Sequence, residues 1–152
     1  ANAHVQVIGV FDRKWVSPLA HVLKDLGCRH AFVVHGEDGL DEISLMDVTH
    51  VAELLNGDIR EYSISPEEFG LQRCSPEQVR GGSPEENAEI IKAILEDEAG
   101  PKRDIVLLNA SAAIRVGGMA GSLNEGLTVA RKSIASGAAR EKLQELCKVS
   151  HS

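Results

Sequence analysis

The first third of the chain alternates short apolar runs with one amphipathic segment. Residues 5–10 (VQVIGV) and 30–35 (HAFVVH) are apolar and rich in β-branched residues, which predicts two strands. Between them, apolar residues recur at steps of three and four from Lys14 to Leu26, and Gly27 follows where a helix would stop. A strand, a helix and a strand in this order favour two parallel strands joined by a right-handed crossover.

A hairpin is expected next. Asn56-Gly57 separates two apolar runs at residues 48–55 and 59–64, and an Asn-Gly pair in this position is the strongest short hairpin signal. The alternation of apolar and polar residues is imperfect in residues 48–55, so a helix is the alternative there. We favour the hairpin.

The second half of the sequence is predicted to be helical. Ser-Pro-Glu occurs at Ser65, Ser75 and Ser83, each time followed by Glu or Gln, which is typical of a capped helix start with proline at the first helical position. The first two can only start short turns, whereas the third leads into an amphipathic helix that ends before Gly100-Pro101. Residues 104–116 (DIVLLNASAAIRV) begin like a strand and continue like a helix, and their length favours the helix.

Two more helices complete the expected fold. One runs from Ser122, with Glu125 in its first turn, to Ser136-Gly137, and a short last helix covers residues 139–146. The sequence contains no linker rich in Pro, Gly and Ser. We therefore predict a single α/β domain over residues 1–152, with a small sheet at the front and a helical C-terminal half.

The composition indicates an ordinary soluble protein. Hydrophobic residues make up 43% of the 152 residues and charged residues 26%, and no apolar run approaches the ~20 residues needed to cross a bilayer. The formal net charge of −7 argues against nonspecific binding to nucleic acid. Cys28, Cys74 and Cys147 are far apart and lack the spacing of a zinc site, so we expect reduced thiols in a cytoplasmic protein.

Four carboxylates follow the second predicted strand within six residues: Glu37, Asp38, Asp41 and Glu42. Ligands bind at the carboxyl ends of strands in open α/β sheets, and clustered carboxylates suit Mg²⁺, which pairs one or two acids with the phosphates of a substrate. The alternative is a solvated acidic turn with side-chain to backbone bonds at Asp38 and Asp41. On spacing alone we favour the turn. His35, beside this loop, is expected to be a hydrogen-bonded structural histidine.

Several strings together resemble one enzyme family. They are residues 33–42 (VVHGEDGLDE), 80–82 (RGG) with Pro84 and Asn87-Ala88, 107–110 (LLNA), and 136–137 (SG) with Ala139. In this order they resemble the C-terminal half of anthranilate phosphoribosyltransferase, over essentially the whole chain. The resemblance implies part of a mixed, mainly parallel β-sheet flanked by helices, as in the C-terminal domain of the nucleoside phosphorylase and phosphoribosyltransferase-like fold.

The same resemblance implies a transferase of tryptophan biosynthesis. In this family the amine of anthranilate displaces pyrophosphate from C1 of phosphoribosyl pyrophosphate, and Mg²⁺ neutralises the leaving group. The adjacent Asp-Glu pair of the family's string binds magnesium, which implies Asp41 and Glu42 as metal ligands here. Glu37 and Asp38 match no such role, so we expect them to be solvated turn acids. No catalytic residue is assigned.

Other parts of the family's machinery have no counterpart in this sequence. They are the Gly-Thr-Gly-Gly-Asp loop that cradles pyrophosphate, the Lys-His-Gly-Asn segment, the arginine that meets anthranilate, and the helical domain through which full-length members form homodimers. We therefore expect roughly half an enzyme, inactive alone. Two alternatives stay open: a non-catalytic, nucleic-acid-binding paralogue, against which the Asp41-Glu42 pair and the net charge argue, and a subunit that needs a separately encoded N-terminal half.

Overall fold

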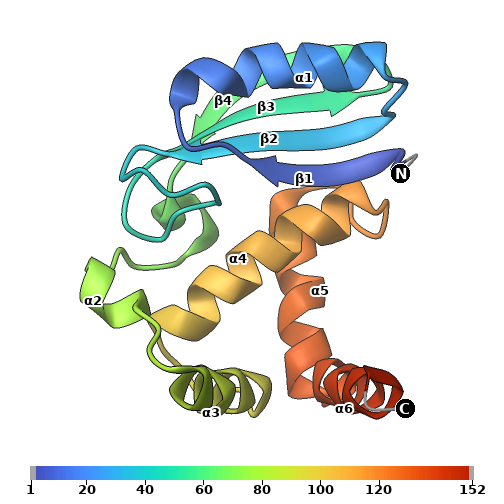
Figure 1. The fold of residues 1–152 in the computed structure, drawn as a ribbon. Coiled ribbons are helices and arrows are strands. Elements are labelled where there is room, and N and C mark those ends of the chain that lie inside the picture. The colour runs from blue at the N-terminus through green and yellow to red at the C-terminus, as the bar shows by residue number, and fades with distance from the viewer. Residues whose placement is uncertain (1–2, 151–152) are drawn as a thin grey trace.

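A four-stranded sheet is followed by a helical half in the computed structural model, which describes residues 3–150 (Figure 1). The elements in chain order are β1 (Val5–Gly9), a 3-10 turn η1 (Arg13–Trp15), α1 (Val16–Asp25), β2 (His30–Gly36), β3 (Thr49–Leu55), β4 (Asp58–Ile64), a second 3-10 turn η2 (Pro66–Phe69), α2 (Pro76–Val79), α3 (Pro84–Leu95), α4 (Pro101–Val116), α5 (Leu123–Ala135) and α6 (Ala138–Ser150). Helices α3 and α6 lie farthest from the sheet (Figure 1).

The strands are ordered β1-β2-β3-β4 across a mixed sheet. β1 and β2 run parallel, as predicted, whereas β2–β3 and β3–β4 are antiparallel. The described part of the sheet is therefore not mainly parallel, because the chain turns back on itself twice after β2. Asn56 and Gly57 both have positive φ, at 51° and 92°, and form the two-residue turn of the β3–β4 hairpin. The hairpin prediction is confirmed and the helix alternative is wrong.

Strand β2 is buried along its whole length and contributes side chains to the hydrophobic clusters on both faces of the sheet. Successive side chains of a strand point to opposite faces. Ala31 and Val33 accordingly pack with α1 on one side, while Phe32 and Val34 pack with Leu107 and other residues of α4 on the other side. Figure 1 shows α1 above the sheet and α4 below it. This double cover fixes the carboxyl end of β2, where the acidic loop begins.

The helix starts are set by local sequence. Capping boxes form at Ser65, Ser75 and Ser83, and the first two lead only into η2 and the four-residue α2, as predicted. α4 begins at Pro101, three residues earlier than predicted, because proline at the first helical position costs no hydrogen bond. α6 is longer than predicted, since Val149 continues the three-residue apolar spacing and no residue up to Ser150 breaks the helix.

A buried ionic cluster joins the sheet to the end of α4. Glu53 of β3 accepts hydrogen bonds from Arg115 Nη2 at 2.7 Å and from the Tyr62 hydroxyl at 3.1 Å, and lies 3.2 Å from His30 Nε2. Burial first, and then the nearby Glu53 charge, raise the pKa of Tyr62 above its ordinary value. The cluster holds three strands and one helix together at a single carboxylate.

Among residues 3–150, Cys28, Cys74 and Cys147 take part in no disulfide. Within residues 3–150, no helix combines the length and the apolar character needed to cross a membrane.

Candidate metal site

The acidic loop covers residues 37–48 and leaves the sheet where β1 and β2 both end. Because these strands are parallel, their carboxyl ends meet at the same edge. The buried His35 ties the two ends together, since its Nδ1 lies 2.8 Å from the carbonyl oxygen of Val10 and donates a hydrogen bond to it. His35 is thus a hydrogen-bonded structural histidine, as predicted.

Gly9, at the end of β1, lies directly under the loop. A Cβ atom built on Gly9 would lie 1.4 Å from the carbonyl oxygen of Asp41, far inside van der Waals contact. Only a residue without a side chain can occupy this position while the loop keeps its path. The backbone of Asp41 is therefore placed by β1 as well as by the loop that follows β2.

Asp38 shapes the turn from inside the loop. Its Oδ1 accepts a hydrogen bond from the Leu40 amide at 3.2 Å, and its Oδ2 accepts one from the Ser44 hydroxyl at 2.5 Å. Ser44 Oγ in turn accepts from the Met46 amide at 2.9 Å. The expected side-chain to backbone bond is confirmed for Asp38, which serves the structure of the loop.

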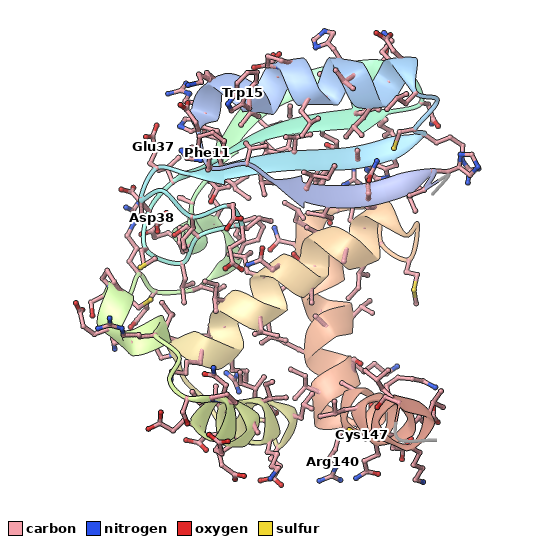
Figure 2. All side chains as sticks on the ribbon, viewed as in Figure 1. Phe11, Trp15, Glu37, Asp38, Arg140 and Cys147 are labelled. Carbon is pink, nitrogen blue, oxygen red and sulfur yellow. The ribbon has the colours of Figure 1, made fainter. Side chains whose placement is uncertain are left out.

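Glu37 is paired, unlike the solvated acid that was predicted. It accepts a short hydrogen bond from His50 Nε2 and forms an ion pair with Arg13 at 3.3 Å. The hydrogen bond from His50, helped by electrostatic attraction to His50 and Arg13, lowers the pKa of Glu37. Figure 2 shows Glu37 and Asp38 at the end of the sheet where β2 stops. Both acids are engaged within the protein.

Asp41 and Glu42 are the two acids of the loop whose carboxylates remain available to bind a ligand. Both residues are exposed, and neither carboxylate has a hydrogen bond or ion pair to another residue in the range 3–150. The pKa of Glu42 is raised, because its carboxyl loses part of its hydration in the loop and because the negative charges of Asp41 and Asp38 lie nearby. A positive charge bound here would relieve that repulsion.

The donor set fits Mg²⁺. Carboxylate oxygens are the ligands this ion prefers, and it commonly takes one or two of them and completes its shell with water and substrate phosphates. Asp41 and Glu42 are the residues that would hold it. Across residues 3–150, no three His, Cys, Asp or Glu side chains gather closely enough to enclose a metal ion. Binding through two carboxylates and a phosphate does not require such a cage.

Sequence reasoning missed two residues that position the loop. Gly9 is one, and Asn109 of α4 is the other, since its carboxamide bonds to the main chain of Ile43. Asn109 belongs to the LLNA string and Gly9 to the first predicted strand. Nothing in the local spacing could show that either of them meets the loop, because their partners are 32 and 66 residues away in the chain.

The fold and the site agree with one protein family. Residues 1–140 match the family described as "Glycosyl transferase family, a/b domain", and the chain belongs to this family. Its relatives share a more particular name. A Rhodopseudomonas palustris (strain BisB5) protein that is 52% identical over 149 residues, and a Methanobrevibacter smithii protein that is 47% identical over 152 residues, are both called anthranilate phosphoribosyltransferase. The resemblance inferred from the sequence strings is confirmed.

Solved structures give the same result. The enzyme of this name from Thermus thermophilus superposes with a TM-score of 0.81 at 41% identity, over 90% of this chain and 40% of that one. The Saccharomyces cerevisiae enzyme "in complex with PRPP and Mg" superposes with a TM-score of 0.83 at 25% identity, over 92% of this chain and 41% of that one. The chain spans 44% of the Rhodopseudomonas relative and 45% of the Methanobrevibacter relative, and all or nearly all of its own length is matched.

Proposed function

We propose that this chain is the metal-binding part of an anthranilate phosphoribosyltransferase, which transfers the phosphoribosyl group of phosphoribosyl pyrophosphate to anthranilate in tryptophan biosynthesis. One observation carries the proposal: the adjacent carboxylates of Asp41 and Glu42, which have no partner among residues 3–150, lie in the loop that starts where β1 and β2 end. The fold that presents them is shared with a yeast enzyme solved with PRPP and Mg. We place this activity in the cytoplasm.

In the proposed reaction, the nitrogen of anthranilate forms a bond to C1 as the bond from C1 to pyrophosphate breaks. The electron pair of that bond leaves with pyrophosphate, and the nitrogen gives up one proton, which the released pyrophosphate or water takes. Mg²⁺, when bound, neutralises the charge that develops on this leaving group. Asp41 and Glu42 would hold the ion, while Gly9 and Asp38 keep the loop in one conformation, so that the two carboxylates are in place before substrate arrives.

We propose that other parts of a longer polypeptide bind and orient the two substrates. The described residues supply carboxylates at this edge, but substrate orientation accounts for a large share of the rate in two-substrate reactions. We propose that the pyrophosphate-cradling loop, the anthranilate pocket and the contacts of a homodimer lie outside residues 1–152. On this basis the chain alone should give no turnover, and turnover close to that of a complete relative would contradict the partial role.

The metal assignment is tested by Asp41→Asn with Glu42→Gln in the complete polypeptide. Turnover should fall by at least about 100-fold, because a bound metal stabilises transition-state charge by several kcal/mol. Calorimetry should show that Mg²⁺ no longer strengthens binding of phosphoribosyl pyrophosphate. The melting temperature should not fall, since neither carboxylate is paired among residues 3–150 and their mutual repulsion is removed.

A matched control separates this loss from the change in net charge. Glu96→Gln with Glu98→Gln removes two exposed carboxylates just after α3, outside the acidic loop, and should leave the magnesium dependence intact. If the Asp41/Glu42 double variant keeps the magnesium dependence of the parent, Asp41 and Glu42 are not the metal ligands and the proposal fails.

A further inference from the structure

Among the described residues, Asn109 is the side chain of α4 that forms hydrogen bonds with the acidic loop. Asn109 Oδ1 accepts a hydrogen bond from the Ile43 amide at 2.9 Å, and Asn109 Nδ2 donates to the Ile43 carbonyl at 2.8 Å. Nδ2 also donates to the carbonyl of Ile105, one turn earlier in α4, at 3.0 Å. That third bond fixes the orientation of the carboxamide on its own helix. Ile43 is thus bound at both of its main-chain polar groups by a single side chain.

The chemistry of this contact is specific to a primary amide. The N–H and C=O of one residue can be matched side by side only by a group that carries an acceptor and a donor in one plane. Aspartate offers two acceptors and would place an oxygen against the Ile43 carbonyl. Alanine offers neither. The contact therefore depends on the chemical identity of Asn109 and not on its volume alone.

The position of the contact connects it to the candidate metal site. The amide that Asn109 accepts from belongs to the peptide group joining Glu42 to Ile43, so the carboxamide holds the main chain immediately after the acidic pair. Ile43 itself is 1% exposed, which anchors the other side of that peptide in the core. On β1, Gly9 lies close against the carbonyl of Asp41. The backbone of the acidic pair is thus held from α4 and from β1.

The carboxylates themselves have no partners among residues 3–150. The backbone that carries them therefore fixes where their Cα–Cβ bonds start and point, and so which positions the two carboxylates can reach together. Groups that orient metal ligands without touching the metal commonly change metal affinity when they are altered. The Asn109 carboxamide, which bonds to the Glu42–Ile43 peptide, is a group of this kind.

We infer that Asn109 is a positioning residue for the metal loop, which orients the carboxylates of Asp41 and Glu42 toward a shared cation. This inference rests on the proposed function. It makes α4, and not the strands alone, part of the machinery that aligns the magnesium-bearing acids.

The test compares Asn109→Ala and Asn109→Asp with the parent in the complete polypeptide. Calorimetric titration measures the Mg²⁺ concentration that half-saturates the binding of phosphoribosyl pyrophosphate. We expect this concentration to rise by about 10- to 100-fold in both variants, the range typical of outer groups that orient metal ligands. At saturating Mg²⁺, kcat should recover toward the parent value. In the metal-free protein, the Ile43 amide should exchange hydrogen faster, because its acceptor is lost in Asn109→Ala.

Ser111→Ala is the matched control. Ser111 lies two residues further along α4 and is buried, and among residues 3–150 its hydroxyl bonds only to the carbonyl of Leu108, at 2.6 Å. Its loss therefore affects the helix without removing a hydrogen bond to the loop. It should leave the half-saturating Mg²⁺ concentration unchanged. If Asn109→Ala does not fold, Asn109→Asp, which keeps the size of the side chain, is judged by the same titration.

The outcomes separate this inference from the proposed function. If the Asp41→Asn/Glu42→Gln double variant loses magnesium-dependent binding while the Asn109 variants keep the parent half-saturation, Asn109 is only structural and the inference is overturned. A lowered melting temperature with unchanged half-saturation overturns it in the same way. If the double variant keeps its magnesium dependence, the proposed function itself fails.

Discussion

Replacing Gly9 by alanine should disturb the acidic loop more than its single added methyl group suggests. The new Cβ would lie 1.4 Å from the Asp41 carbonyl oxygen, whereas an ordinary van der Waals contact begins near 3.4 Å. The loop or the end of β1 must therefore move by about 2 Å. The obstacle is main chain, so no side-chain rotation relieves it. Overpacking of this kind costs about 1–3 kcal/mol, and a displacement of about 1 Å in a reacting group can cost about 100-fold in rate.

Two measurements on the complete polypeptide check this reasoning. Denaturant unfolding should show the loss of stability, and titration with Mg²⁺ should show weaker metal-dependent binding of phosphoribosyl pyrophosphate. Gly121→Ala is the control, because its Cβ would meet only the end of the flexible Glu125 side chain, at 3.1 Å. If Gly9→Ala matches the parent in both measurements, the loop has another path over β1 and the argument from close contact is refuted.

The ionic cluster around Glu53 yields two further predictions. Glu53→Gln should lower the free energy of unfolding by about 3 kcal/mol, since it leaves the largely buried Arg115 without its carboxylate partner. Denaturant titration measures this loss. A loss well below 1 kcal/mol would contradict a structural role for the pair. The raised pKa of Tyr62 means that the folded state favours the neutral phenol. The stability that Tyr62 contributes is therefore complete below pH 10.0, its ordinary pKa, and is lost as the pH rises toward the pKa of Tyr62 in the folded state. Ultraviolet titration of this single tyrosine should show ionisation displaced to higher pH, and Tyr62→Phe should remove the corresponding alkaline loss of stability.

Local patterns were sufficient for most of the fold. The parallel pair of strands, the hairpin at Asn56-Gly57 and the three capped helix starts each depend on residues close together in the chain, and each is confirmed. The weak alternation in β3 has a physical cause. Glu53 is buried there because Arg115, 62 residues later, supplies its counter-charge. A polar residue at a core position hides the period of the strand until its distant partner is known.

The candidate site was predictable only in part, for a similar reason. Asp41 and Glu42 could be singled out because they follow a strand and match a specific string. The different roles of the four acids could not, because they depend on contacts between elements. Glu37 is engaged by His50 and Asp38 by Ser44. What distinguishes the metal-binding candidates is the absence of such partners within residues 3–150, a property that only three-dimensional placement reveals.

The outer edge of β1 has a consequence for how a larger sheet would be assembled. β1 is the last strand on its side among the described residues, so its outward-facing amides and carbonyls can template another strand. A strand added in parallel would end at the same edge as β1 and β2. Whatever segment follows that strand would then emerge at the edge of the sheet where the acidic loop begins. The free edge of β1 therefore sets the direction of an added strand so that the residues after it come near the loop that carries Asp41 and Glu42.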